Sequence, residues 1–343
     1  MSRIRATVPS VLVPMLLAAT ACGPSEPAED APPVDPVEAA VATITAEDYA
    51  RRIGVLAHDS MRGRATPSPA LEAAAEWIAA EFRSMGLEGG AADGGFIQRY
   101  DLPRGDGDAP NVVAVLRGSD PVLADEYLVY SAHMDHVGVR EADESGDSIF
   151  NGADDNASGT TAVLEVAEAM AALPTAPRRS VIFLLVSGEE RGLWGSAHYA
   201  DNPTVPADRI VANLNADMVG RNWPDTIVAI GKEHSDLGTT LERVNAAHPE
   251  LGMTAIDDLW PDQNFYSRSD HYNFARKGVP ILFFFNGVHD DYHGRDDEVD
   301  RIDHDKASRI ARLLFYLGLD VANADERPQW NPESYDAIVG GGG

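Results

Sequence analysis

The chain has 343 residues, with 27 Lys or Arg against 55 Asp or Glu, so its formal net charge is −28. A hydrophobic fraction of 44% is typical of a folded globular protein and excludes a disordered chain. The acidic excess, without any Lys/Arg cluster, argues against a nucleic-acid partner. The single cysteine excludes an intramolecular disulfide.

The N-terminus predicts export from the cytoplasm. Arg3 and Arg5 precede a short apolar stretch that is too short to span a bilayer, so we interpret residues 1–21 as a signal peptide. Small residues before Cys22 resemble the lipobox of bacterial lipoproteins. We therefore expect a lipid-anchored periplasmic or cell-envelope protein that meets the membrane only through this anchor. The alternative is an ordinary secretory signal and a secreted protein.

Composition divides the rest of the chain into three parts. Residues 22–40 are rich in Pro, Ala, Glu and Asp and predict a disordered tether, whereas residues 323–343 predict a loose C-terminal tail. Residues 41–322 contain no linker or internal repeat and predict one domain. Its periodicity predicts helices at about 45–57, 69–85, 157–173 and 303–322, and strands at 111–116, 127–132, 181–186, 210–215, 226–230 and 280–285. This alternation predicts an α/β fold, with a mixed, mostly parallel central sheet flanked by helices on both faces.

The first chemically informative residues follow the strand at 127–132. His133 and Asp135 are two residues apart, so their side chains point the same way on an extended chain, and a carboxylate there can orient a metal-binding imidazole. Alone, this pair is more often structural. Asp154 and Asp155 come next, at the start of a helix, among Gly and other small residues. They can act as simple helix caps, or one carboxylate can bridge two cations.

The remaining strands also end in acidic residues or histidines. Glu189 and Glu190 follow an apolar strand, where two carboxylates are unfavourable unless cations are near. Asp217 follows another, and both His289 and His293 come after the last strand. Each segment is weak evidence by itself. Together, at strand ends of one α/β sheet, these His and carboxylate groups without Cys favour a catalytic zinc pair over a structural zinc.

In this order, the motifs SAHMDHVG, NGADDNASGT, SGEERGLWGS, NADMVG and YHGRDD resemble the extracellular zinc aminopeptidase superfamily, which also contains glutaminyl cyclases and glutamate carboxypeptidases. The resemblance covers about residues 41–320. It implies the zinc exopeptidase fold, with a mixed eight-stranded sheet and two Zn²⁺ ions above its strand ends. The protease-associated domain that many members carry is absent, because residues 98–127 are too few to contain it.

The resemblance also implies roles for individual residues. One zinc would take His133 and Asp217, the other Glu190 and His293, with Asp154 bridging them. Glu189 would be the general base, and Tyr292 would steady the oxyanion. Asp135 would lie behind His133, and Asp155 would complete the Asp-Asp link without binding metal.

The resemblance implies a zinc aminopeptidase that acts on peptides with a free N-terminus. A glutaminyl cyclase that forms N-terminal pyroglutamate is the first alternative, since the motifs permit both. A catalytically inactive binding module is the second, although such relatives typically lose ligands. Side-chain preference and oligomeric state have no signature in the sequence.

Overall fold

The computed structural model describes residues 35–340. The predicted signal peptide, Cys22 and most of the expected tether lie outside the described residues. The helices are α1 (Pro36–Val41), α2 (Ala46–Leu56), α3 (Pro69–Ser84), α4 (Gly159–Ala171), α5 (Trp194–Asp201), α6 (Leu237–Ala247), α7 (His271–Ala275), α8 (His304–Asn323) and α9 (Pro332–Ile338). The strands are β1 (Glu88–Gly89), β2 (Ile97–Asp101), β3 (Asp108–Leu116), β4 (Tyr127–His133), β5 (Gly138–Val139), β6 (Ile149–Phe150), β7 (Ser180–Val186), β8 (Ile210–Ala216), β9 (Thr226–Ile230), β10 (Thr254–Ile256) and β11 (Ile281–Phe284).

The long helices begin and pack as their sequences dictate. In α3, the Ser68 side chain accepts a hydrogen bond from the N–H of Leu71 at 3.1 Å, and Pro69 occupies the first turn, where no backbone donor is needed. In α8, Asp303 caps the N–H of Lys306 at 3.0 Å. Both helices bury their apolar residues against the sheet, as the periodicity predicts.

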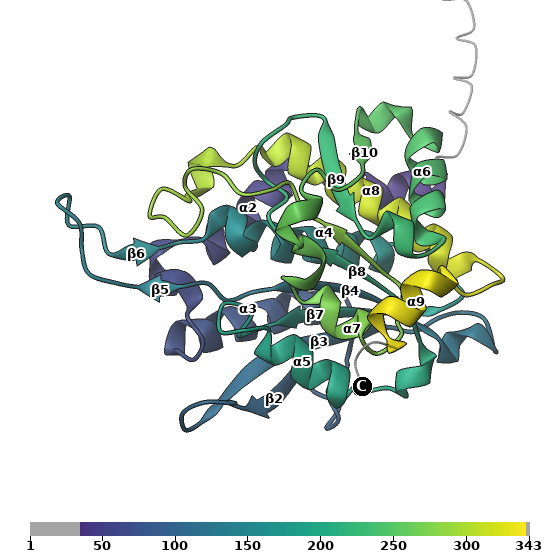
Figure 1. Ribbon diagram of the computed structural model, residues 1–343, viewed down its shortest axis with the longest axis horizontal. Helices are drawn as coiled ribbons and strands as arrows, with labels where there is room; N and C mark the ends of the chain where they lie inside the picture. The colour runs from purple at the N-terminus through teal and green to yellow at the C-terminus, as the bar shows by residue number, and fades with distance from the viewer. Residues whose placement is uncertain (1–34, 341–343) are drawn as a thin grey trace, which may run out of the picture. The chain divides into compact units, whose positions relative to one another are not determined.

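A mixed sheet of nine strands forms the centre of the fold. Figure 1 shows the sheet with helices packed around it. Eight strands follow in the order β1-β3-β7-β4-β8-β11-β9-β10, and β2 pairs with β3 beside them. β7, β4, β8 and β11 are mutually parallel. β3 runs antiparallel to all of its neighbours, whereas β9 is antiparallel to β11 and parallel to β10. The predicted α/β class is confirmed, and β2 accounts for the ninth strand.

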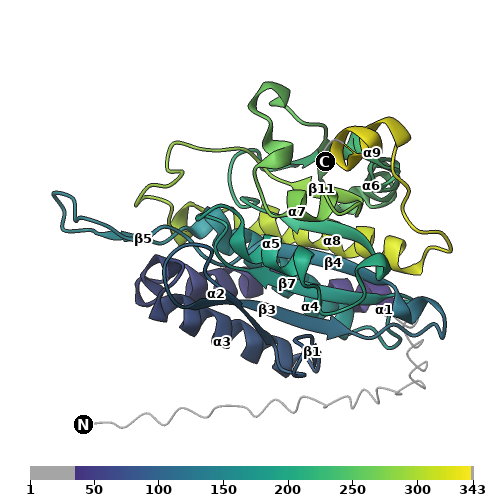
Figure 2. The ribbon, with the colours of Figure 1, turned by 60° about the horizontal axis from the view of Figure 1, so that its bottom comes forward.

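Alternate residues of the central strands face two separate cores. Leu128 and Tyr130 of β4 join the core formed with α2, α3, α4 and α8, whereas Val129 joins the core on the face covered by α5 and α7. This two-residue period is that of a strand buried on both faces. Figure 2 shows the strands between α3 on one side and α7 on the other.

The structure describes part of each segment that is expected to be flexible. α1 occupies the end of the expected tether and buries Ala40 and Val41. The C-terminal segment packs on the body, because the indole N–H of Trp330 donates to the carbonyl of Gly278 at 2.9 Å and the N–H of Asn331 donates to His234 at 2.8 Å. These contacts hold the described parts of both segments against the rest of the fold.

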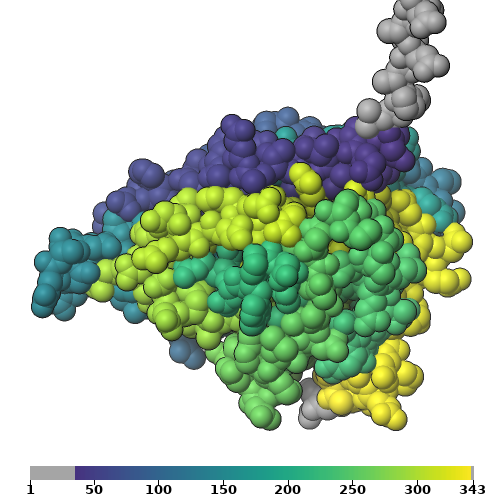
Figure 3. Space-filling view, turned by 90° about the horizontal axis from the view of Figure 1, so that it is seen from above, coloured from purple at the N-terminus to yellow at the C-terminus, as the bar shows by residue number. Residues whose placement is uncertain are grey.

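The hairpin of β5 and β6 projects from the body, together with the loop that joins its strands (Figures 1 and 3). Among residues 35–340, no helix is long and apolar enough to cross a membrane.

Candidate metal centre

The parallel strands bring the predicted site residues to one edge of the sheet. His133 is the last residue of β4, Asp217 directly follows β8, and Glu189 and Glu190 lie in the loop after β7. His293 comes from the loop after β11. Because these strands are parallel neighbours, their carboxyl ends meet at the same edge, which is where open α/β sheets bind ligands.

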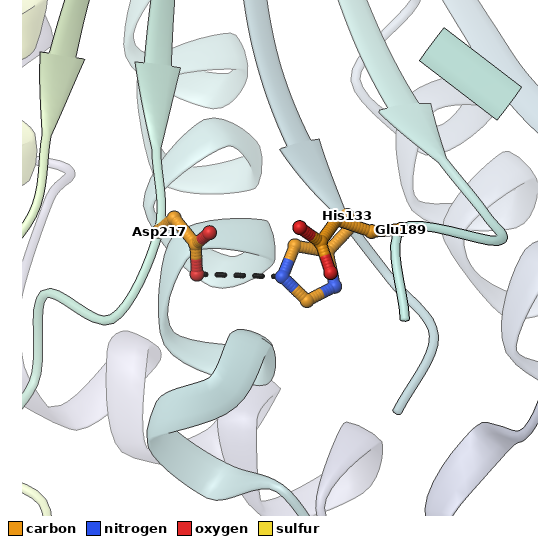
Figure 4. Close-up of side chains that lie close together, drawn as sticks. All are labelled: His133, Glu189 and Asp217. Atoms are coloured by element: carbon orange, nitrogen blue, oxygen red, sulfur yellow. Dashed lines mark ion pairs between the residues drawn. The ribbon is translucent and has the colours of Figure 1, made fainter. Parts of the chain in front are cut away.

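The first group of donor atoms comprises His133, Glu189 and Asp217, whose ligand atoms lie within 4.8 Å of one another. The imidazole Nε2 of His133 is 3.3 Å from Oδ1 of Asp217 (Figure 4). The same Nε2 is 3.4 Å from Oδ1 of Asp155. His133 therefore faces two carboxylates, each at a distance that two ligands of one metal ion can have.

The second group lies on the other side of Asp155. Its Oδ2 is 3.1 Å from Nε2 of His293, and that nitrogen is also 3.1 Å from Oε2 of Glu190. The other oxygen of Glu190, Oε1, is 2.9 Å from Nδ1 of His136, which is 3.7 Å from Oδ2 of Asp155. One carboxylate oxygen of Asp155 thus faces each group.

These spacings fit metal coordination. Two ligands about 2.0–2.1 Å from a tetrahedral zinc are roughly 3.3 Å apart, close to the donor distances in both groups. Among the described residues, neither Oδ1 of Asp217 nor Oε1 of Glu190 has a hydrogen-bond partner, although both are buried. Buried carboxylate oxygens are normally satisfied, so these atoms are available to a cation. A donor set of only imidazole and carboxylate suits zinc.

Without bound cations, the carboxylates of the two groups lie too close together for all of them to be ionised. Burial raises the pKa of Glu189 and of Asp155, and neighbouring carboxylates add to both shifts. Burial alone would lower the pKa of His293, but hydrogen bonds to Asp155 and Glu190 overcome it and raise the pKa to about 10. Protonated carboxyl groups and a protonated imidazole are the forms that a buried acidic cluster adopts without a cation. Bound cations would release these protons.

The geometry reverses the expected roles of Asp154 and Asp155. Asp155 lies between the two groups, whereas Oδ1 of Asp154 accepts the N–H of Gly220 at 2.7 Å and its Oδ2 lies 3.3 Å from Nε2 of His289. Asp297 accepts both backbone N–H groups of the pair, at 2.9 and 3.0 Å. These two hydrogen bonds hold the backbone in an irregular conformation, so the side chains of Asp154 and Asp155 point in different directions. The sequence alone does not show which of two adjacent aspartates points toward the metal-binding groups. His289, the rejected alternative to His293, accordingly faces Asp154.

Several side chains position the donors. Asp135 lies behind His133, with Oδ1 3.7 Å from its Nδ1, and it also accepts the N–H of Glu189 at 3.2 Å. Thr66 donates to the other oxygen of Asp135 at 2.8 Å. Ser269 donates to Oδ2 of Asp217 at 2.9 Å, leaving Oδ1 toward His133. Such contacts fix ligand orientation.

Sequence reasoning missed two residues of the site. His136 was visible as a second histidine in the same motif, three residues after His133, but it was given no role. Arg64 is fully buried and donates to the backbone carbonyls of Met134 and Gly152 at 2.8 and 3.0 Å. It ties the loop after β4 to the loop that carries Asp155, and this role has no signature in sequence.

A pocket opens beside the first group. Its walls include Glu189 and Tyr292, together with a set of apolar side chains. The ring of Tyr292 stacks on His293, with centroids 4.0 Å apart. Burial, followed by the nearby carboxylates, raises the pKa of Tyr292, so its hydroxyl stays protonated and available as a hydrogen-bond donor.

Comparison with known proteins decides the family. Residues 111–318, more than half of the chain, match peptidase family M28. The chain belongs to peptidase family M28. The matched region begins in β3 and ends in α8, so it contains every His, Asp and Glu of the two candidate metal-binding groups. The family membership that the motifs predicted is confirmed.

Two relatives are similar to this M28 chain in sequence. A probable zinc metalloprotease of Pyricularia oryzae is 24% identical over 79% of this chain and 62% of its own length. Aminopeptidase YwaD of Bacillus subtilis is 27% identical over 52% of this chain and 39% of its own length. The chain therefore spans less than two thirds of either relative.

Two solved structures share the fold. The LapA aminopeptidase of Legionella pneumophila superimposes with a TM-score of 0.65 at 20% identity, covering 84% of this chain and 75% of LapA. The glutaminyl cyclase of Porphyromonas gingivalis gives a TM-score of 0.63 at 19% identity, covering 80% of this chain and 98% of the cyclase. The similar scores show one fold for both activities.

Proposed function

We propose that this M28 protein is a zinc-dependent aminopeptidase that binds two Zn²⁺ ions and removes N-terminal residues from peptides. The observation that carries the proposal is the position of Asp155, with one oxygen 3.4 Å from His133 and the other 3.1 Å from His293. A carboxylate placed in this way is suited to bridging two ions. Relatives that include a probable zinc metalloprotease and an aminopeptidase support the choice of metal and reaction.

His133 and Asp217 would hold one ion, Glu190 and His293 the other, and Asp155 both. Zinc, when bound, supplies a Lewis acid for the peptide carbonyl and lowers the pKa of a water molecule. Glu189 is the general base in this proposal: it lies with His133 and Asp217, and Asp155 supplies the third ligand beside them in its place.

In this proposal, Glu189 takes a proton from the attacking water and delivers it to the leaving amine. Tyr292 donates its hydroxyl hydrogen to the carbonyl oxygen as negative charge develops there. A positively charged substrate amine is favoured by the carboxylates around the pocket.

The test uses the zinc-loaded protein and a mixture of free, N-acetylated and Gln-led peptides, with mass spectrometry of the products. We expect stepwise loss of first residues from free peptides only. The Glu189→Gln variant should keep its zinc and lose about 10²–10⁴-fold in kcat. Zinc content by elemental analysis, expected at two ions per chain, is measured on both proteins.

Each other outcome selects a different function. Loss of ammonia from Gln-led peptides without cleavage would identify a glutaminyl cyclase. No turnover by protein that holds zinc would favour the inactive binding module. Cleavage of N-acetylated peptides would contradict an aminopeptidase, because no free amine is then recognised.

We also propose that the protein is exported and anchored through Cys22, on the strength of the N-terminal sequence alone. Labelling with a radioactive fatty acid in a bacterial host should mark the protein and fail to mark a Cys22→Ser variant. Labelling that persists in the variant would contradict lipidation at this residue.

A further inference from the structure

The pocket beside the first donor group has a distinctive composition. Away from the metal-binding side chains, its walls are mainly apolar and include Phe265, Phe283 and Phe285. Arg268 is the one cationic side chain among the described residues that line it. A peptide bound at the metal-binding groups would therefore have its first residue, or the residue after it, next to this arginine.

The fold holds Arg268 at the pocket wall. Its backbone N–H donates to the carbonyl of Phe265 at 3.0 Å, and its guanidinium carbon lies 4.6 Å above the centre of the Phe265 ring. The next residue, Ser269, is tied to Asp217 by a hydrogen bond of 2.9 Å. A guanidinium stacked on an aromatic ring keeps its N–H edges free for a planar acceptor.

The charge of Arg268 has no anionic partner in the described part of the chain. Among residues 35–340, its guanidinium forms no ion pair and donates no hydrogen bond, although the chain has about two acidic residues for each basic one. By contrast, the half-exposed Arg99 contacts both Glu72 and Asp108, at 2.7 and 2.6 Å. Arg99 on the surface thus pairs with carboxylates of the protein, whereas Arg268 does not pair with any described carboxylate.

We propose that Arg268 binds a carboxylate of the substrate and makes the enzyme selective for peptides that present a carboxylate at this position. The proposal rests on the aminopeptidase function proposed above. A guanidinium binds a carboxylate through two parallel N–H···O bonds, which combine charge with geometry. The carboxylate can come from the side chain of a first Glu or Asp, whose methylene groups suit the apolar walls, or from the C-terminus of a dipeptide.

Matched peptides separate these two sources. Glu-Ala-amide and Gln-Ala-amide differ only in the side-chain charge, and Leu-Ala and Leu-Ala-amide differ only in the terminal charge. For the zinc-loaded enzyme we expect kcat/KM to favour the charged member of one pair by about tenfold or more. The pair that shows the preference identifies the source of the carboxylate.

Variants then assign the preference to Arg268. In Arg268→Gln the ratio should fall to about one, and in Arg268→Lys, which keeps the charge without the planar fork, it should be intermediate. Arg83 provides the matched control, because it is also an exposed arginine stacked on a phenylalanine, 5.1 Å from the ring centre of Phe96, but lies on α3 outside the pocket. Arg83→Gln should leave both ratios unchanged.

A binding measurement keeps the inference independent of turnover. The four peptides are titrated by calorimetry into zinc-loaded Glu189→Gln protein, with and without Arg268→Gln. A charged-to-neutral affinity ratio of about ten that is lost with the arginine supports the inference, even if the native enzyme cleaves none of these peptides and the proposed function fails. Ratios that are unchanged by Arg268→Gln in both experiments would overturn it.

Discussion

Two buried acidic clusters in this protein differ in where their positive charge comes from. Between α2, α3 and α4, Arg52 contacts Glu81 at 3.1 Å, Glu165 at 2.6 Å and Glu168 at 2.5 Å, with only 3% of its side chain exposed. At the strand ends, the basic side chains that the described structure pairs with Asp155, Asp217 and Glu190 are imidazoles. The first cluster carries its own permanent cation, whereas in the proposed function the second is completed by cations from outside.

The type of basic side chain distinguishes a buried charge cluster that stabilises the fold from one that can bind a metal ion. A guanidinium stays charged at any physiological pH and fills the space between its carboxylates. An imidazole can give up its proton, so His133 and His293 can exchange a proton for a metal ion. Acidic residues alone therefore do not identify a metal site; the kind of base that faces them does.

Removing the shared carboxylate should have the largest effect. Dividing about 10–16 kcal/mol for a zinc site over four ligands gives about 3 kcal/mol per ligand, and Asp155→Ala loses a donor to both ions. We expect zinc content to fall below one ion per chain under conditions that saturate the native protein, as measured by elemental analysis after dialysis. Asp154→Ala is the matched control and should keep both ions. Retention of zinc by the first variant and its loss by the second would restore Asp154 as the bridge.

Removing the resident cation of the other cluster should affect stability instead. Arg52→Met leaves Glu165 buried without its partner, which typically costs about 3–5 kcal/mol. Urea unfolding should show this loss, and zinc content should not change. Arg51→Met removes a half-exposed neighbour, 3.2 Å from Asp48, and should cost less than about 1 kcal/mol. Equal losses in the two variants would erase the distinction between the clusters.

His136 tests how far the second metal group extends. His136→Gln removes the imidazole that faces Oε1 of Glu190 at 2.9 Å, so we expect a loss of about 10–100-fold in affinity for one of the two ions. Competition with a fluorescent zinc chelator measures the two affinities. His289→Gln, a buried histidine that faces Asp154, should leave both unchanged. If His136→Gln binds both ions with native affinity, His136 belongs only to the protein's packing.

The sequence predicted the large features of both fold and site because each has a local signature. Helical periodicity placed α3 and α8, apolar runs placed the central strands, and residues after those strands marked the site. The choice between Asp154 and Asp155 depends on backbone directions set by Asp297, about 140 residues away. Arg64 acts through backbone carbonyls of distant loops, which sequence patterns do not display. Long-range contacts of this kind had to come from the structure.

A third buried cation gives the smallest predicted effect. Lys306 is fully buried and donates to the carbonyl of Arg221, but it forms no ion pair among the described residues. Burial lowers its pKa from 10.5 to about 8, and the charge of Asp154 only partly offsets this. Unlike Arg52, Lys306 therefore loses its proton more readily in the folded protein than in the unfolded chain.

The sign of the resulting pH dependence follows from proton binding. Between pH 8 and 10.5 the unfolded chain holds a proton on Lys306 that the folded chain has begun to lose, so the free energy of unfolding rises with pH. From pH 7 to 9 this group should contribute about 1.4 kcal/mol. Urea unfolding of the metal-free protein and of Lys306→Met at both pH values measures this contribution as the difference between the two proteins, because His293, whose pKa is raised to about 10, contributes with the opposite sign to both. The same pH dependence in both proteins would mean that Lys306 keeps its proton in the fold, as Arg52 does, because the charge of Asp154 then compensates burial fully.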